Sequence, residues 1–257
     1  MPPAVRRSRI LERIQRDGGV SVAELARDHD VSPITVHRDL EQLAREGLVE
    51  RVHGGARAIR GTQPIATAWT ARRAQASAAK ATIAEHAVHA VDESSTIFLD
   101  SSSTCLALAR RLMEDPPNGV TLVTNSPAIA YEILAPEIHV VVTPGELDQH
   151  MRMLAGRWTI DFISELHFAV AFVSAAGLTL DAGLTTSRRT LADVVNAARS
   201  NTDRTIGLID STKFGRASLL SIAPAAELDV IVTDDGISEE TADAYKTAGV
   251  RLQIATK

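Results

Sequence analysis

The chain has 257 residues, enough for one large domain or for a small domain joined to a medium one. Although 45% of its residues are hydrophobic, no run approaches the roughly 18 apolar residues of a membrane-spanning helix, and the basic N-terminus lacks the apolar stretch of a signal peptide. The single cysteine, Cys105, cannot form an intrachain disulfide or a cysteine-based metal site. We therefore expect a cytoplasmic protein with no metal, no cofactor and no membrane partner.

The net charge of -5 is unevenly distributed along the chain. Residues 1–60 carry eleven arginines against nine acidic residues, whereas the rest of the chain carries 16 basic and 23 acidic residues. This division suits a small DNA-binding head joined to an acidic body.

Residues 6–29 predict two helices. Apolar residues recur at helical spacing between residues 6 and 17, and two glycines then end the first helix. Ser21 and Glu24 have the spacing of a capping box, and the second helix that they begin is about two turns long.

The third helix carries the candidate DNA-reading surface. Ser32 caps this helix, Pro33 takes its first position, and Val36, Leu40 and Leu43 fall on one apolar face. Two helices joined by a tight turn, the second with a polar outer face, can place a recognition helix in the major groove of double-stranded DNA. From this helix we expect contacts to DNA by Ser32, Pro33, Ile34, Thr35, His37 and Arg38.

Individual roles follow from the side-chain chemistry. Thr35 and Arg38 are assigned to a base edge or a phosphate, and His37 to a base. Repulsion from phosphate makes Asp39 a poor direct contact, so we expect it to form an internal salt bridge that orients Arg38. On these patterns alone, a three-helix packing module without a DNA role is an equally good interpretation.

Residues 48–59 predict a wing. Residues 48–52 alternate like a strand, residues 53–55 form a turn, and residues 56–59 return as a second strand. Arg51, His53 and Arg57 can then lie along a phosphate backbone or in a minor groove.

Residues 60–69 predict a linker between domains at 1–59 and 70–257, because they combine Gly, Pro and small polar residues without periodicity. A helical pattern over 70–91 opens the second domain, and short apolar strands then alternate with helices. This order predicts an α/β domain with a doubly wound, mostly parallel sheet. The expected strands are Thr96–Asp100, Thr121–Thr124, His139–Thr143, Phe168–Val173, Thr205–Asp210, Val230–Thr233 and Arg251–Ile254.

Four loops at the expected carboxyl ends of strands are rich in polar groups. Two of them, 100–104 and 124–126, precede helices, whose N-terminal N–H groups bind anions. The third loop covers 143–146. In the fourth, 210–215, a carboxylate and an ammonium lie three residues apart and can hold a hydroxyl and a phosphate. An ordinary capped helix start explains any one such loop, whereas four at one edge favour a ligand site. The candidate ligand residues are Asp100, Ser101, Ser102, Ser103, Thr104, Thr124, Asn125, Ser126, Gly145, Asp210 and Lys213.

Two groups of sequence blocks resemble the DeoR family of bacterial transcriptional regulators. Blocks 20–26, 31–40 and 47–56 match its winged helix-turn-helix in order and spacing. Blocks 96–101, 123–126, 177–185, 208–215 and 231–234 resemble its sensor domain, which shares its fold with ribose-phosphate isomerases and glucosamine-phosphate deaminases.

The resemblance implies a non-enzymatic repressor of carbohydrate uptake or catabolism genes, which a phosphorylated sugar or related metabolite releases from DNA. It also implies a homodimer or homotetramer that binds repeated half-sites. The alternative is an enzyme like the sugar-phosphate isomerases, although their glycine-rich loop and catalytic carboxylate pattern have no counterpart here.

Five residues depart from the family's pattern. His37 replaces the first of two adjacent arginines, and histidine cannot pair bidentately with guanine. Ser102 and Ser103 replace a glycine and a threonine of the phosphate loop, which leaves the backbone less free for close approach. Pro144 replaces the first of two glycines, and Val195 replaces a lysine and so removes a positive charge.

Overall fold

The computed structural model describes the chain except for residues 1–5, 8, 12, 15–18, 46–47, 53, 58–68, 70–71, 74 and 257. The chain divides into two compact units, Met1–Ala68 and Trp69–Lys257. Apart from Trp69, the predicted linker lies outside the described residues, and so do residues 58–59 of the predicted wing. Within the described part of the chain, no helix has the length and apolar character needed to cross a membrane.

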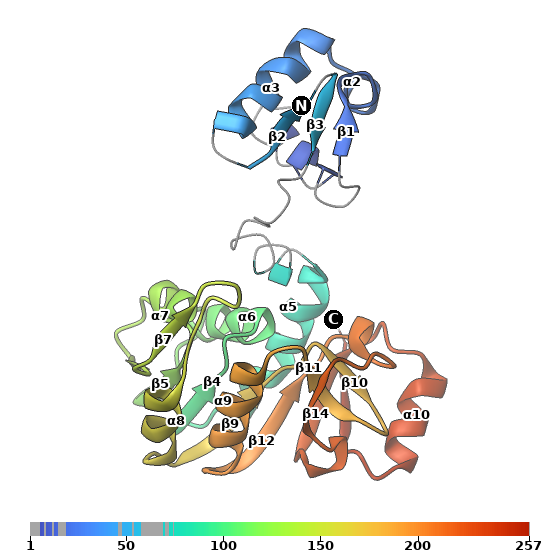
Figure 1. Ribbon diagram of the computed structural model, residues 1–257. Coiled ribbons are helices and arrows are strands. Elements are labelled where there is room, and N and C mark those ends of the chain that lie inside the picture. Colours follow the sequence, from blue (N-terminus) through green and yellow to red (C-terminus); the bar gives the residue numbers. More distant parts are fainter. Residues whose placement is uncertain are drawn as a thin grey trace. The chain divides into compact units, whose positions relative to one another are not determined.

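The first unit combines helices with a small antiparallel sheet in the order β1-β3-β2 (Figure 1). Its elements are the helical residues within 6–14, β1 (Gly19–Ser21), α2 (Val22–His29), α3 (Pro33–Arg45), β2 (Glu50–Val52) and β3 (Gly55–Arg57). The pairing of β2 with β3 confirms the predicted wing. Strand β1, which pairs with the other edge of β3, was not predicted, because Gly19 resembled only the end of the first helix.

The predicted caps and core of the first unit are confirmed. The Ser21 hydroxyl accepts from the N–H of Glu24 at 3.2 Å, and the Glu24 carboxylate accepts from the N–H of Ser21 at 2.9 Å. Val36, Leu40 and Leu43 are buried in one hydrophobic cluster with residues of the first two helices. This cluster fixes which face of α3 points away from the core.

Asp39 forms the predicted internal salt bridge, but with a different partner. Its buried carboxylate lies 2.6 Å from Nε of Arg6 and 3.6 Å from Nη1 of Arg7. The prediction that it orients Arg38 is therefore wrong. Neighbouring residues of a helix point about 100° apart, so Asp39 faces the first helix while Arg38 faces solvent.

The second unit is built on a seven-stranded parallel sheet in the order β15-β14-β12-β9-β4-β5-β6 (Figure 1). Its strands are β4 (Thr96–Leu99), β5 (Val120–Thr124), β6 (Ile138–Val142), β9 (Phe168–Val173), β12 (Thr202–Leu208), β14 (Val230–Asp234) and β15 (Leu252–Ala255). All seven predicted strands are confirmed, and the predicted doubly wound α/β fold is the observed one.

Both faces of this sheet are covered. In β9, Val170 and Phe172 pack into one hydrophobic cluster, and Ala171 and Val173 pack into the other. Because successive side chains of a strand point to opposite faces, a strand buried on both faces is apolar at every position. One cluster includes residues of α5 (Ser77–Ala87), α6 (Ser103–Leu112) and α7 (Pro127–Glu132), and the other includes α8 (Arg157–Ser164), α9 (Arg189–Arg199) and α10 (Glu239–Thr247).

Several short elements of the second unit were not predicted. A hairpin of β7 (Glu146–Asp148) and β8 (Met153–Ala155) follows β6, and a separate antiparallel sheet contains β10 (Gly177–Thr179), β11 (Gly183–Thr186) and β13 (Leu220–Ala223). Short 3-10 helices cover Val88–Ala90, Ser211–Lys213 and Ala225–Glu227. The helical pattern predicted over 70–91 is interrupted at Ala76, whose φ of 52° is left-handed.

Replacing Asp39 with asparagine removes the carboxylate that Arg6 and Arg7 approach and keeps the side-chain size. Breaking a buried ion pair leaves the remaining charge poorly compensated, so we expect the free energy of unfolding of the first unit to fall by about 3 kcal/mol. The urea dependence of amide hydrogen exchange in α2 and α3 of the full-length protein measures this loss. The control Glu50→Gln breaks an exposed pair and should change exchange little; equal losses in both variants would contradict the assignment.

Candidate nucleic-acid interface and ligand site

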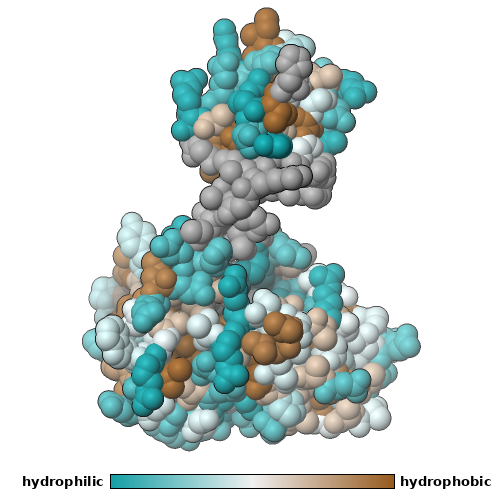
Figure 2. All heavy atoms as spheres, in the orientation of Figure 1, coloured by the Kyte–Doolittle hydropathy of each residue, from teal (hydrophilic) through white to brown (hydrophobic). Residues whose placement is uncertain are grey.

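The N-terminal part of α3 is the exposed surface that the sequence predicted. The Ser32 hydroxyl accepts from the N–H of Thr35 at 3.2 Å and lies 2.9 Å from the Thr35 hydroxyl, so both side chains serve the helix cap. Ile34 is 67% exposed, which leaves it free to contact a thymine methyl group. Pro33, His37 and Arg38 are also exposed. Figure 2 shows hydrophilic side chains over much of the visible face of this unit, with a few apolar ones between them.

His37 and Arg51 contact each other between the helix and the wing. Nη2 of Arg51 lies 3.0 Å from Nδ1 of His37. Arginine can only donate, so Nδ1 of His37 is the acceptor and its ring proton is on Nε2. Nη1 of Arg51 is buried and has no hydrogen-bond partner among the described residues. His37 thus presents a single N–H donor and not the fork of an arginine.

Arg57 is paired within the wing. Its Nε and Nη2 donate to the two carboxylate oxygens of Glu50 at 3.0 and 2.9 Å, across directly paired positions of β2 and β3. These hydrogen bonds lower the pKa of Glu50. An Arg57 contact to phosphate would have to replace this pair. His53, the third predicted wing residue, lies outside the described residues.

The strand order of the second unit reverses between β4 and β9. From β4 the chain continues through β5 and β6 toward one edge of the sheet, and from β9 it continues through β12, β14 and β15 toward the other. The loops that leave such neighbouring strands diverge to opposite faces and open a crevice at the carboxyl ends, where ligands bind in folds of this type. The loops that begin at Asp100 and Ser174 meet at this point.

The carboxylate of Asp100 joins these two loops. It is fully buried and accepts the N–H of Ser102 at 2.8 Å and the N–H of Ser174 at 2.7 Å. The Ser174 hydroxyl donates to the carbonyl of Leu208 and accepts from Nζ of Lys213 at 2.9 Å. Nζ of Lys213 also lies 3.6 Å from the Asp210 carboxylate. Predicted ligand residues from the ends of β4 and β12 are thus brought together.

The serine loop, residues 101–104, begins α6. Ser102 is the N-cap, and its hydroxyl accepts from the N–H of Cys105 at 3.1 Å. Its φ of -74° and ψ of 156° suit any residue, so this position does not need the glycine of the family's pattern. The Ser101 hydroxyl lies 3.4 Å from Sδ of Met153, in the β7–β8 hairpin. The fully buried Thr104 hydroxyl has no partner among the described residues.

The loop after β5 is mostly occupied by internal hydrogen bonds. The Thr124 hydroxyl donates to the carbonyl of Leu99 at 2.7 Å and accepts from the N–H of Ser126 at 3.0 Å. The Ser126 hydroxyl caps α7. Nδ2 of Asn125 donates to the carbonyl of Leu154 at 3.0 Å, while its buried Oδ1 lacks a partner in the described part of the chain. Asn125 is therefore the residue of this loop with an unused acceptor.

Gly145 is required by packing. At its φ of 147°, a Cβ would lie 2.1 Å from the Thr159 hydroxyl oxygen and 2.7 Å from the carbonyl of Ala155. The Thr159 hydroxyl donates to the carbonyl of Pro144 at 2.7 Å, which fastens this turn to α8. Val195 is fully buried in the hydrophobic cluster that α9 shares with the sheet, so it completes the core there.

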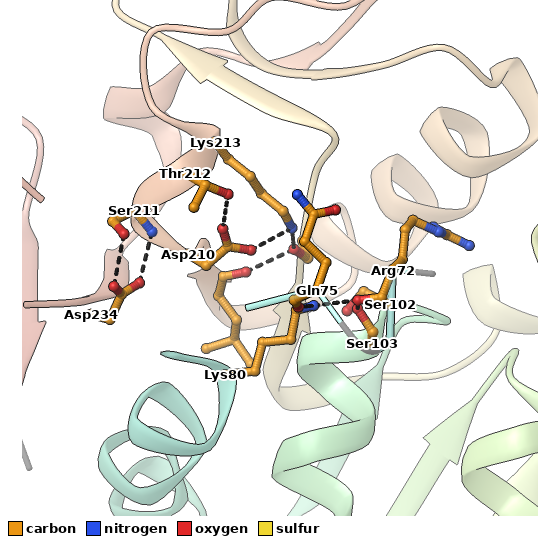
Figure 3. A network of polar contacts seen from close by, with 12 residues as sticks. Arg72, Gln75, Lys80, Ser102, Ser103, Asp210, Ser211, Thr212, Lys213 and Asp234 are labelled. Atoms are coloured by element: carbon orange, nitrogen blue, oxygen red, sulfur yellow. Dashed lines mark hydrogen bonds and ion pairs between the residues drawn. The ribbon is translucent and has the colours of Figure 1, made fainter. Parts of the chain in front are cut away.

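Two cations near the site, Arg72 and Lys80, were missed. Lys80 is 4% exposed, and its Nζ donates to the carbonyl of Arg72 at 2.5 Å and to that of Gln75 (Figure 3). Burial, then the charge of Lys213, lowers the pKa of Lys80 to about 8, and burial also lowers the pKa of Lys213. Both residues precede β4, so a search of strand ends does not select them. A lysine on the same helix face as buried Ile83 and Ala87 was the available signal.

Among the described residues, no group of three or more His, Cys, Asp or Glu side chains is placed to hold a metal ion. The polar groups at the switch point are instead hydroxyls, backbone N–H groups, ammonium groups and two carboxylates. This set suits a ligand that carries both hydroxyls and a negative charge.

Two family models match the chain. The DeoR-like helix-turn-helix domain matches residues 6–62, and the DeoR C terminal sensor domain matches residues 75–235. The chain is 31% identical to the HTH-type transcriptional regulator GolR of Listeria innocua over 99% of this chain and 100% of that protein. It is 28% identical to the glycerol-3-phosphate regulon repressor of Escherichia coli, over 91% and 92% of the two chains.

Solved structures resemble part of the chain. Ribose 5 phosphate isomerase A from Neisseria gonorrhoeae matches 52% of each chain with 17% identity and a TM-score of 0.40. An eIF2B delta chain from Chaetomium thermophilum matches 56% of this chain and 51% of its own, with 16% identity and a TM-score of 0.42.

Replacing Asp100 with asparagine puts an NH₂ group against one of two N–H donors. We expect the free energy of unfolding of the second unit to fall by roughly 1–3 kcal/mol, because one buried donor loses its acceptor. Urea unfolding of the full-length protein, followed by circular dichroism, measures the loss. The matched control is Asp234→Asn. It makes the same change from carboxylate to amide at the end of β14, where Asp234 accepts from Ser211. An unchanged stability of Asp100→Asn would show that Asp100 does not join the loops.

The lowered pKa of Lys80 predicts a pH dependence of stability. In the unfolded chain Lys80 stays protonated up to its ordinary pKa of 10.5, whereas in the folded unit it releases its proton near 8. Between these values the unfolded state binds more protons, so the contribution of Lys80 to the free energy of unfolding rises with pH. The wild-type protein should therefore gain stability relative to Lys80→Met between about pH 8 and about pH 9.5 in urea titrations. A difference in the free energy of unfolding between the two proteins that does not change with pH would contradict the burial of the Lys80 ammonium.

Proposed function

The chain belongs to the DeoR family of transcriptional regulators, and we propose that it is a sequence-specific DNA-binding repressor that a phosphorylated sugar or sugar-like metabolite releases from DNA. In this proposal residues 1–59 are the winged helix-turn-helix domain, residues 60–69 the linker, and residues 70–257 the effector-binding and oligomerisation domain. The controlled genes serve carbohydrate uptake or catabolism, in line with the name of one relative, the glycerol-3-phosphate regulon repressor.

The ligand side of this proposal rests on the switch point between β4 and β9. Asp100, Asp210 and Lys213 converge there through Ser174, from strand ends that are more than a hundred residues apart in the chain. A carboxylate can accept from sugar hydroxyls, and an ammonium can bind a phosphoryl group. The serine loop adds N–H groups at the start of α6.

The DNA side rests on the exposed start of α3 and the wing. Arg38 is exposed beside His37, whose contact with Arg51 brings the wing next to the recognition helix. Helix-turn-helix proteins read base edges with the N-terminal residues of this helix, while neighbouring cations contact phosphates. A protein that reads chromosomal DNA in this way acts in the cytoplasm.

We also propose that the second unit forms a homodimer or homotetramer, so that two heads bind repeated half-sites. Several large apolar side chains of this unit are exposed, which is typical of interfaces. The most exposed are Tyr131 at 86%, Leu134 at 85% and Leu219 at 82%. Figure 2 shows apolar residues at the surface of this unit between hydrophilic ones. Sedimentation of the full-length protein would give the number of copies.

The chain is proposed to have no enzymatic activity, because its relatives bear the names of transcriptional regulators. The alternative, an enzyme like the sugar-phosphate isomerases, requires turnover. We expect the purified protein not to interconvert pentose phosphates, and measurable isomerisation would favour the alternative.

The proposed function is tested by selecting genomic DNA fragments with the purified protein and sequencing them. Recovery of a repeated motif upstream of sugar-uptake or catabolic genes would support the repressor and narrow the effector to intermediates of that pathway. Recovery of no fragment above background by the folded protein would overturn it.

Arg38→Ala should weaken binding to the selected motif by about tenfold to a hundredfold, because one cation that contacts a base edge or a phosphate is lost. Fluorescence anisotropy with the motif and with a scrambled duplex measures the change. Arg45→Ala, at the last turn of the same helix, is the matched control and should keep the sequence preference. Normal binding by Arg38→Ala would show that the recognition face is wrongly assigned.

Lys213→Ala should retain DNA binding and lose the response to the effector.

A further inference from the structure

The exposed residues at the start of α3 differ in whether their side chains are already used within the protein. The Ser32 hydroxyl lies 2.9 Å from the Thr35 hydroxyl and accepts from the N–H of Thr35. Ile34, His37 and Arg38 are exposed and take no part in these hydrogen bonds. The last three side chains are therefore available to select bases.

Ile34 is an apolar side chain that the core of the first unit does not use. It is 67% exposed, and it lies outside the hydrophobic cluster that buries Val36 and Leu43. Leu43 follows nine residues later, about two and a half turns along α3, so it projects from the opposite side of the helix. Among the described residues of the first unit, only Ile34 and Val52 are exposed large hydrophobic side chains. Packing within this unit therefore does not explain an isoleucine at position 34.

The major groove of DNA offers one apolar group on its base edges. These edges present hydrogen-bond donors and acceptors, together with the 5-methyl group of thymine. A recognition helix enters this groove with its N-terminal residues toward the bases. Ile34, the second residue of α3, therefore has thymine as its matching base and loses an apolar contact where the methyl group is absent.

His37 lies beside Ile34 on the helix and adds a single donor. Residues three apart on a helix are neighbours, with Cβ atoms about 5–6 Å apart, and successive base pairs are about 3.4 Å apart. The two side chains can therefore reach the same base pair or neighbouring ones. Because Nη2 of Arg51 lies 3.0 Å from Nδ1 of His37, the ring N–H of His37 is on Nε2. This N–H can donate to N7 of a purine or to O4 of thymine.

We propose that Ile34 contacts the 5-methyl group of a thymine in each half-site, and that Nε2 of His37 donates to an acceptor on the same or a neighbouring base pair. This inference rests on the proposed function and deepens it, because it names the base chemistry that the recognition helix selects. Each half-site then contains a thymine whose methyl group contributes to binding.

The test compares duplexes that differ by one methyl group. In the motif obtained by fragment selection, each thymine of one half-site is replaced in turn by deoxyuridine, which keeps the hydrogen-bonding groups and lacks the 5-methyl group. Fluorescence anisotropy with the full-length protein measures both affinities. At the thymine that Ile34 contacts, deoxyuridine should weaken binding about fourfold, as expected when one methyl group is no longer removed from water.

The variants assign this difference to Ile34. Ile34→Ala should bind the thymine and deoxyuridine duplexes equally at that position, and Ile34→Val should keep part of the difference. Val52→Ala is the matched control, because it also shortens an exposed apolar side chain of the first unit, and it should keep the whole difference. The ratio of the two affinities is compared within each variant, so a general loss of affinity or stability does not change the result.

A second measurement adds the methyl group to another base. When the same thymine is replaced by cytosine, with guanine opposite, 5-methylcytosine should bind the wild type more tightly than cytosine does. Ile34→Ala should bind these two duplexes equally.

His37→Ala tests the hydrogen-bond donor separately. This variant should keep the difference between thymine and deoxyuridine. It should lose preference among the four base pairs at that position or at one next to it. An unchanged preference at all of these positions would overturn the assignment of His37.

Equal binding of thymine and deoxyuridine at every position by the wild type would overturn the inference, as would a selected motif without thymine. A difference that Ile34→Ala keeps would overturn it too. All three results leave the proposed repressor standing, because the fragment selection has then already shown sequence-specific binding. A folded protein that selects no fragment overturns the proposed function itself.

Discussion

The buried carboxylate of Asp100 is the interaction on which the geometry of the candidate ligand site depends. At the strand-order reversal, the loops after β4 and β9 have to leave toward opposite faces of the sheet, and their first N–H groups lose their strand partners. Asp100 accepts one N–H from each loop, at Ser102 and at Ser174. Hydrogen bonds to a charged acceptor inside a protein are each worth about 1.5–3 kcal/mol, so this one side chain holds the two loops together.

The other polar contacts of the site extend from this carboxylate. The N–H of Ser174 donates to Asp100, and its hydroxyl accepts from Nζ of Lys213. Lys213 in turn forms an ion pair with Asp210. Ser102, held on the other side, caps α6 and fixes the serine loop that reaches the Arg72 carbonyl through Ser103. In the proposed function, a ligand at this point would contact residues from distant parts of the chain. Its binding energy could then favour one arrangement of these loops over another, which is the physical requirement for regulation by an effector.

The sequence predicted the parts of the fold whose signals are local and repeated. Most strands of the parallel sheet are short apolar runs because both faces of the sheet are covered, and the helix starts with a side-chain cap have a Ser in place. Strands β1 and β7 were missed because neither contains a run of apolar residues: β1 is Gly-Val-Ser and β7 is Glu-Leu-Asp. Lys80 and Arg72 were missed because both lie in helical segments before β4, whereas the search considered the residues that follow strands. Asp39 was assigned a role from its neighbour in sequence, whereas the helix directs it to Arg6.

The contact between His37 and Arg51 shows how a single departure from the family's pattern changes two elements at once. An arginine at position 37 cannot accept a hydrogen bond, so it could not hold Arg51 as histidine does here. Conversely, His37 offers one N–H, on Nε2, and cannot pair bidentately with guanine. With histidine at position 37, the recognition helix lacks a bidentate donor there, and Arg51 of the wing is held by a hydrogen bond to the helix. If His37 reads a base as proposed, that contact and the placement of Arg51 are coupled, because turning the His37 ring removes the acceptor that holds Arg51.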